Sequence, residues 1–220
     1  MSAFLALTQV EFTVSGFVPL ALGFFGLGTG YLVYGPEELF KLPGRSRAVD
    51  LTTGLWGIWM PGFLQFLTGV YLWVGLLWLH TVREPALYMA ALAFTAYGVH
   101  WWALGMTRVF GGDPRPNGFM AVAFTMLSAL GIVVFFKAGD APVGGLFIGL
   151  TAVYICEFIA SLGVRESVGA DGRGAQRTPT RLGETGERAL GFFHIGTGLW
   201  LMYLTWAVTL GITVNVKLPV

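Results

Sequence analysis

Charged side chains are scarce in this sequence. Aspartate, glutamate, lysine and arginine make up 11% of the 220 residues, whereas roughly 25% is usual for a soluble globular domain. Hydrophobic residues make up 55%, and the mean hydropathy is +0.70. A chain of this composition cannot cover a water-facing surface with charge, which excludes an ordinary soluble domain. We therefore expect a polytopic membrane protein.

Cysteine and clustered catalytic groups are scarce as well. The single cysteine, Cys156, excludes an intrachain disulfide and a cysteine-based zinc site. His80, His100 and His194 are too far apart in sequence for a recognisable metal motif, so we expect neither a metal nor a cofactor. The sequence has no phosphate-binding glycine-rich motif and no set of serine, histidine and acid residues, so we do not expect an enzyme. A net charge of +1 gives no argument for nucleic acid as a partner.

Long hydrophobic runs are what the sequence has in abundance. Runs able to cross about 30 Å of hydrocarbon lie near 16–34, 51–79, 86–109, 117–137, 143–164 and 188–212. They predict an all-α fold with six transmembrane helices in one domain over residues 1–220. Pro61 and Gly62 interrupt the second run, where we expect a kink or tilt because proline removes a helical hydrogen bond. The composition of residues 165–187 predicts a polar flexible loop.

Lysine and arginine are distributed unevenly over the connections between these runs. The loops after the first, third and fifth runs hold ten of them, and the opposite side holds Arg83, Lys137 and Lys217. Because cytoplasmic loops carry the excess of positive charge, this count places both termini outside.

Glycine is the other excess, with 32 residues concentrated in the hydrophobic runs. Gly26 with Gly30, and Gly145 with Gly149, form small-xxx-small pairs that allow helices to approach closely. Tight helix packing is the structural interpretation, and a pathway lined with bare backbone is the functional one.

Polar groups inside the apolar runs are candidate site residues, because each is costly in hydrocarbon. At about 100° per residue, Tyr97, His100 and Arg108 share one face of the third run. Leu150 and Glu157 share a face of the fifth run. Since both runs lead toward the arginine-rich side, we expect Arg108 and Glu157 to approach each other in one vestibule, where pairing would lower the cost of both charges.

The same residues have structural alternatives. Glu157 and His100 suit interhelical hydrogen bonds as well as a proton path, since histidine exchanges its proton near neutral pH. Arg108 suits an interaction with lipid phosphate as well as attraction of anions. Gln65 is equally suited to bonding a neighbouring helix and to contacting a substrate.

Four short motifs follow one another in a familiar order and spacing. They are residues 19–29 (PLALGFFGLGT), 65–69 (QFLTG), 94–101 (FTAYGVHW) and 149–151 (GLT). Together they resemble the acetate uptake transporter family, which comprises six-span acetate/succinate permeases of bacteria and yeast acetate and ammonia-export relatives. The resemblance covers about residues 17–165.

The resemblance implies six helices around one narrow pathway in each protomer, and protomers assembled into a hexamer in a bacterial inner membrane or plasma membrane. The family's hydrophobic gate corresponds to Phe25, Tyr97 and Leu150. Its hydroxyl-bearing substrate contacts correspond to Thr29, Thr95 and Thr151, and Gln65 and His100 complete the expected substrate-binding set. The resemblance also implies cytoplasmic termini, opposite to the charge count, so the orientation stays open.

The expected function is that of a transporter or channel for acetate and similar short-chain carboxylates, with succinate as a further candidate. We expect proton linkage, with Glu157 and Arg108 in the vestibule or in proton coupling. The expected partners are the carboxylate, protons, membrane lipid and further copies of the chain. Two alternatives remain open: a structural subunit of a membrane complex that transports nothing, and a channel for small neutral solutes.

Overall fold

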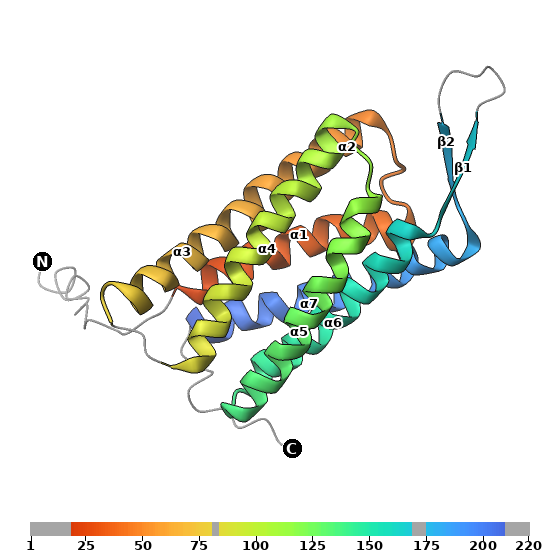
Figure 1. Ribbon diagram of the computed structural model, residues 1–220. Coiled ribbons are helices and arrows are strands. Elements are labelled where there is room, and N and C mark those ends of the chain that lie inside the picture. The colour runs from red at the N-terminus through yellow and green to blue at the C-terminus, as the bar shows by residue number, and fades with distance from the viewer. Residues whose placement is uncertain (1–18, 81–83, 169–174, 210–220) are drawn as a thin grey trace, which may run out of the picture.

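A computed structural model describes residues 19–80, 84–168 and 175–209. Its elements are α1 (Leu20–Phe40), α2 (Arg47–Gly57), the π-helix η1 (Ile58–Phe63), α3 (Leu64–Leu77), α4 (Pro85–Phe110), α5 (Arg115–Lys137), α6 (Ala141–Leu162), β1 (Val164–Val168), β2 (Ala175–Pro179) and α7 (Arg181–Thr209). Because α2, η1 and α3 continue one another, the described residues form six long helical rods packed into a bundle (Figure 1). The expected helical architecture is confirmed. Residues 16–18 and 210–212 of the first and last predicted spans lie outside the described residues, as do Arg83 and Lys217.

Three stretches of helix in the described part of the chain are long and apolar enough to cross a membrane, judged by length and composition. They are Arg47–Leu77, Arg115–Lys137 and Ala141–Leu162. The other three rods, α1, α4 and α7, contribute buried charged or histidine side chains, among them Glu37, His100 and His194. Both cavities described below are lined by α1, α4 and α6, and α7 lines the larger one.

The interruption predicted at Pro61 and Gly62 is a π-helical segment within a continuous rod. The wider turn accommodates a proline, which has no N–H to donate. Trp102 of α4 donates its indole N–H to the carbonyl of Ile58 at 3.1 Å. A side chain from the neighbouring helix thus stabilises the irregular turn.

Glycines set the close approach of several helices. A Cβ at Gly26 would lie 2.7 Å from the carbonyl oxygen of Met60, and one at Gly30 would lie 2.6 Å from the Pro61 ring. In the second small-xxx-small pair, Gly149 packs against Thr197 of α7, whereas a Cβ at Gly145 would have nothing within 4 Å. The packing interpretation therefore fits three of these four glycines.

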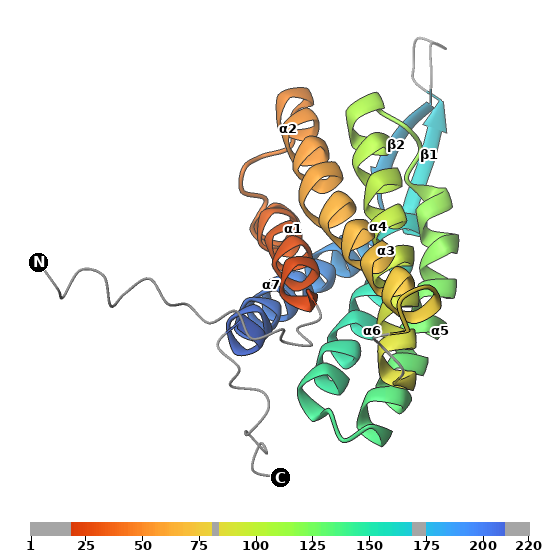
Figure 2. The ribbon, with the colours of Figure 1, turned by 90° about the vertical axis from the view of Figure 1, so that its left-hand side faces the viewer.

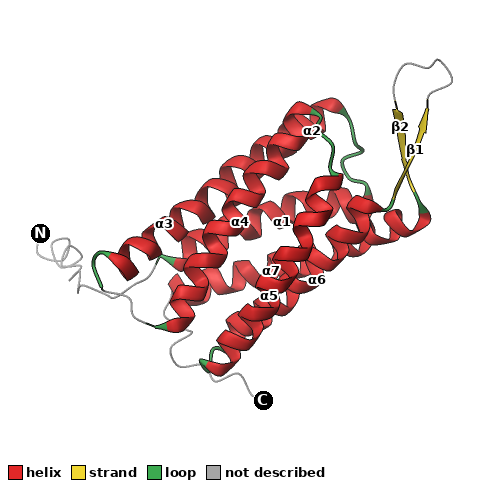
Figure 3. Cartoon of the chain, viewed as in Figure 1, coloured by secondary structure: helices red, strands yellow, loops and turns green. Residues whose placement is uncertain are grey.

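The rods alternate in direction along the chain. The connections α1–α2 and α4–α5 lie at the same end of the bundle as the β1–β2 hairpin (Figures 1 and 2). We call this the hairpin end. The connections α3–α4 and α5–α6 lie at the opposite end, so α1, α4 and α6 all run toward the hairpin end (Figure 3).

The described part of residues 165–187 differs from the expected flexible loop. β1 pairs with β2 in antiparallel register, with Arg165 opposite Thr178, and α7 begins at Arg181. The Thr180 hydroxyl donates to the Gly163 carbonyl at 3.0 Å and accepts from the Gly183 N–H at 3.1 Å. Strand pairing and this helix cap satisfy the hydrogen bonds of backbone groups that would face water in a flexible loop. The glycine-rich, charged composition of the segment does not indicate these contacts.

Candidate functional site

Two cavities lie in series within the bundle. The larger, of about 390 Å³, opens toward the hairpin end and is called the vestibule. The smaller, of about 30 Å³, is called the inner void. Along α1, α4 and α6 the residues lining the inner void precede those lining the vestibule: Leu27 precedes Tyr31, Tyr97 precedes His100, and Leu150 precedes Val153. Since these three helices run in the same direction, the cavities share one axis.

Aromatic rings separate the two cavities. Tyr97 is buried and stacks on Tyr154 with a centroid distance of 5.5 Å, and its ring lies 5.4 Å from that of Phe124. Its hydroxyl lies 2.9 Å from the hydroxyl of Ser128, so the ring is held in place. The stacked rings thus keep the inner void and the vestibule separate in the structure.

The inner void is apolar except for two side chains, Gln65 and Tyr97. Gln65 is fully buried, and neither its amide nitrogen nor its amide oxygen has a hydrogen-bond partner in the structure. Leaving such a group unpaired costs about 1–3 kcal/mol. The amide is free to donate a hydrogen bond to a molecule in the void and to accept one from it.

The predicted gate residues are only partly brought together. Tyr97 and Leu150 both line the inner void, as predicted, but Phe25 does not, and its side chain is 43% exposed. Phe24 lines the void instead and packs on Phe94 with ring centroids 5.6 Å apart. Consecutive residues of a helix point about 100° apart, so a shift of one position exchanges an inward ring for an outward one. Phe24, and not Phe25, therefore lies beside Tyr97 and Leu150 in the inner void.

The three predicted threonine contacts do not reach either cavity. Thr29, Thr95 and Thr151 each donate to the carbonyl four residues earlier at 2.8 Å, and none of them lines the vestibule or the inner void. Thr95 also accepts from the Trp73 indole at 2.9 Å. In apolar surroundings a hydroxyl finds its nearest acceptor in its own helix. Sequence position alone therefore does not make these hydroxyls substrate ligands.

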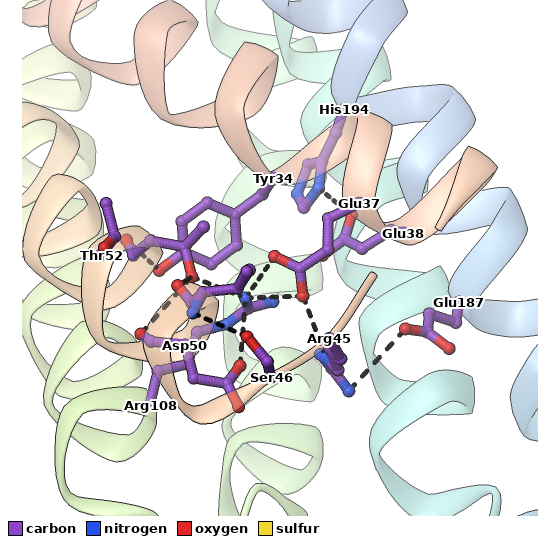
Figure 4. A network of polar contacts seen from close by, with 12 residues as sticks. Tyr34, Glu37, Glu38, Arg45, Ser46, Asp50, Thr52, Arg108, Glu187 and His194 are labelled. Atoms are coloured by element: carbon purple, nitrogen blue, oxygen red, sulfur yellow. Dashed lines mark hydrogen bonds and ion pairs between the residues drawn. The ribbon is translucent and has the colours of Figure 1, made fainter. Parts of the chain in front are cut away.

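Arg108 lines the vestibule, as Glu157 does, but its carboxylate partner is different from the expected one. Its guanidinium lies 2.8 Å from Glu37 and 3.8 Å from Asp50, and it stands 4.2 Å from the centre of the Tyr34 ring (Figure 4). Arg108 follows Tyr97 by eleven residues, whereas Glu157 follows Leu150 by only seven. The guanidinium therefore lies about one helical turn nearer the hairpin end.

Further ion pairs surround the mouth of the vestibule. Arg45, in the α1–α2 connection, contacts Glu37 at 3.0 Å and Glu187 of α7 at 3.9 Å. Lys41 contacts Glu187 at 2.6 Å. Figure 4 shows Arg45 between the two carboxylates. These contacts join α1, α4, α7 and the α1–α2 connection at the hairpin end.

Two histidine–glutamate contacts lie deeper in the vestibule. His194 Nδ1 lies 2.6 Å from Glu38, and His100 Nε2 lies 3.6 Å from Glu157. His100 Nδ1 contacts the sulfur of Met120 at 3.1 Å. Among the described residues, no group of three or more His, Cys, Asp or Glu side chains is placed to hold a metal ion.

A solved structure of the bacterial acetate channel SatP matches this chain with a TM-score of 0.65. The match covers 92% of this chain and 98% of that one, at 16% sequence identity. The chain has the SatP fold. The resemblance indicated by the four motifs is thus confirmed at the level of the fold. No protein-family model matches the sequence, and no curated protein matches it.

Within this SatP-like fold, sequence reasoning missed Glu37, which contacts Arg108, and Glu38 and Glu187, which line the vestibule, and it did not connect His194 with them. A signal for the first two was available, because two adjacent glutamates follow the first apolar run directly. Nothing local marks Glu187 or His194 as their neighbours. Those contacts arise from the packing of α1 against α7.

Proposed function

We propose that this protein is an integral membrane channel or transporter for acetate and similar short-chain carboxylates, with succinate as a larger candidate. The six rods would be six membrane spans in a cell membrane, and protomers would assemble into a homo-oligomer, a hexamer by family resemblance. The fold shared with an acetate channel supports the substrate class. The observation that carries the proposal is the unpaired Gln65 amide in an otherwise apolar void beside Tyr97.

The chemistry of the inner void suits an undissociated short acid. Its apolar lining matches a methyl or methylene group, and an amide can donate to a carboxyl C=O while accepting from a carboxyl O–H. A carboxylate anion has no proton to donate and is expensive to bring into low dielectric. Passage as the neutral acid would carry one proton with each carboxylate, which is the basis of the proposed proton linkage.

The aromatic rings between the two cavities must move for this passage, because the inner void and the vestibule are separate in the structure. Tyr97, Leu150 and Phe24 would act as the hydrophobic gate, and a rotation of these side chains would join the inner void to the vestibule. Glu157 and Arg108 would then meet the solute beyond the gate. Arg108 is already paired with Glu37, so we assign it a structural role at the mouth of the vestibule and not the capture of anions.

Uptake of labelled acetate into proteoliposomes, with and without an imposed pH gradient, tests the proposal. Protein-free vesicles set the baseline, because acetic acid crosses lipid unaided. We expect saturable uptake above this baseline that follows the gradient and changes in Tyr97→Ala. Gln65→Leu should lower it about tenfold, as expected for about 1.4 kcal/mol of lost hydrogen bonding. Uptake at baseline in protein that is shown to be folded would contradict the proposal.

A second candidate function is a channel for small neutral solutes, and the lining of the inner void, which has no charged side chain, favours it. Such a channel would pass urea or ammonia, which have no carboxyl group. Measured swelling of proteoliposomes in urea, together with acetate uptake at baseline, would select this function. A protein that passes neither solute would instead fit a structural subunit of a membrane complex.

A further inference from the structure

The carboxylates around the vestibule fall into an outer and an inner set. The outer set, Glu37, Asp50 and Glu187, contacts arginine or lysine side chains. The inner set, Glu38 and Glu157, contacts histidines instead. The outer carboxylates are therefore neutralised by cations that keep their charge at any physiological pH, whereas the charge on the inner partners depends on a bound proton.

Both inner pairs are buried and line the same cavity. Glu38, His100 and His194 are each 5% exposed, and Glu157 is 7% exposed. The four side chains come from four helices: Glu38 from α1, His100 from α4, Glu157 from α6 and His194 from α7. Figure 4 shows the imidazole of His194 directed at Glu38.

Burial determines how many protons these pairs hold. An uncompensated carboxylate in a low-dielectric site is expensive, and removing one partner of a buried pair is strongly destabilising. A glutamate–histidine pair is neutral overall when it holds one dissociable proton, on the carboxyl group or on the imidazole. Each inner pair is therefore a site that stores one proton.

We propose that these two pairs form the proton-exchange site of the permeation path, which takes up and releases the proton of the carboxylic acid. This inference rests on the proposed function. The pair of Glu157 and His100 comes first after the gate, because His100 lies one helical turn beyond Tyr97. At 3.6 Å it is too long for a hydrogen bond, so it has room for a new partner, whereas the 2.6 Å pair of Glu38 and His194 is closed.

The proton balance of the step is simple. The pair of Glu157 and His100 passes its stored proton toward the pair of Glu38 and His194, which releases one proton to water at the mouth. An acid that has crossed the gate then loses the proton of its O–H bond to the emptied first pair and leaves as the carboxylate anion. In the opposite direction, the first pair protonates an arriving anion.

An unpaired hydroxyl lies on a residue beside the second pair. The ring of Tyr31 lies 4.4 Å from that of His194, and its hydroxyl is buried without a hydrogen-bond partner in the structure. Tyr31 lines the vestibule together with both pairs. It can donate and accept, as a relay between the pairs requires.

The charges around the two pairs balance, with three carboxylates against three cations. The other titratable groups that line the vestibule or contact its lining are Tyr34 and Glu37 of α1, Asp50 of α2, Tyr97 and Arg108 of α4, Tyr154 of α6, Glu187 of α7, and Lys41 and Arg45 of the α1–α2 connection. From α5, Met120 and Phe124 face His100 and do not titrate. Because the cations already contact outer carboxylates, they leave the inner pairs dependent on protons.

The test is the pH profile of equilibrium exchange. Proteoliposomes with equal pH and equal acetate on both sides exchange labelled for unlabelled acetate, measured between about pH 5 and pH 8 and corrected for protein-free vesicles. The variants are Glu157→Gln and Glu38→Gln. The matched control is Glu184→Gln, an exposed glutamate in the first turn of α7 that does not line the vestibule.

In the wild type and in Glu184→Gln, the pairs supply protons, so exchange should decline only weakly with pH. In Glu157→Gln and Glu38→Gln, exchange should stay within about twofold of the wild type at the acid end. It should then fall about tenfold per pH unit, following the fraction of undissociated acid in solution. Retained exchange at the acid end shows that the variants fold and that the gate operates.

Three results would overturn the inference. Variants that follow the wild type at every pH would show that the pairs do not handle the proton. An equal loss at every pH, including the acid end, would show a structural role for them. Wild-type exchange no faster than in protein-free vesicles would remove the proposed function itself and the inference with it.

Discussion

Gln65 and Phe24 line the inner void with different chemistry. The amide offers two unpaired hydrogen-bonding atoms, and the ring closes the apolar wall around them. Neither residue is exposed in the closed structure, so their contribution to selectivity depends on what the gate admits when it opens. Single side chains at this level should therefore alter size selectivity without altering the fold.

Phe24 and Phe25 form a natural matched pair for this test. Phe24→Leu removes the ring that lines the inner void, so a monocarboxylate bulkier than acetate should pass several-fold faster through it. Phe25→Leu changes a ring that is 43% exposed and should leave both rates unchanged. Uptake of acetate and of the bulkier acid into proteoliposomes gives the ratio. An unchanged ratio in Phe24→Leu, or a raised one in Phe25→Leu, would contradict the gate proposed with Phe24.

At the scale of elements, glycine decides how closely α4 packs against the rod formed by η1 and α3. A Cβ at Gly98 would lie 2.6 Å from the backbone nitrogen of Phe66 and 2.9 Å from the carbonyl oxygen of Gly62. Backbone atoms cannot rotate away as a flexible side chain can. The position of Tyr97, the preceding residue of α4, therefore depends on this contact.

Gly98→Ala should separate α4 from α3 and lower the free energy of unfolding by about 1–3 kcal/mol, as overpacking does. Gly145→Ala is the control, because a Cβ there meets nothing within 4 Å and alanine favours helix. Thermal unfolding in detergent should give a lower midpoint for Gly98→Ala and an unchanged or higher one for Gly145→Ala. Equal midpoints for the two variants would contradict the packing argument.

At the scale of the whole molecule, the alternating rods place successive connections at opposite ends of the bundle (Figure 1). If all six rods cross the membrane, the α1–α2 and α5–α6 connections face different compartments. Three of the rods have the length and composition expected of a membrane span. The other three, α1, α4 and α7, could cross as well if the polar side chains that they direct into the vestibule are kept away from lipid.

Single cysteines introduced at Gly44 and Ala138, in a Cys156→Ala background, test this topology. Gly44 has open space around it in the α1–α2 connection, and Ala138 is exposed at the end of α5. A maleimide that does not cross membranes should label one of them in intact cells and the other only after lysis. The labelled position also decides between outside and cytoplasmic termini. Labelling of both from one side would contradict six spans.

The elements were largely predictable because their signals are local. Hydrophobic length places four of the rods within four residues of their observed bounds, and proline marks η1. α1 ends six residues later than predicted, and α7 begins seven residues earlier. The hairpin was not predictable, because β1 and β2 are stabilised by pairing across residues that composition describes as loop. Tyr97 and Leu150 were assigned to the gate from short motifs. The motifs did not show that Phe24 lines the inner void in place of Phe25, because a motif does not specify the rotation of its helix.

The sequence by itself determined that this chain is an apolar bundle of helices with a polar face on the third and fifth runs, since run length and helical period are properties of neighbouring residues. The tertiary structure decided which side chains meet. Glu38 and His194 are 156 positions apart, and Arg108 takes Glu37 instead of Glu157. These contacts depend on the rotation and depth of each helix against its neighbours, which only the packing of the whole bundle specifies.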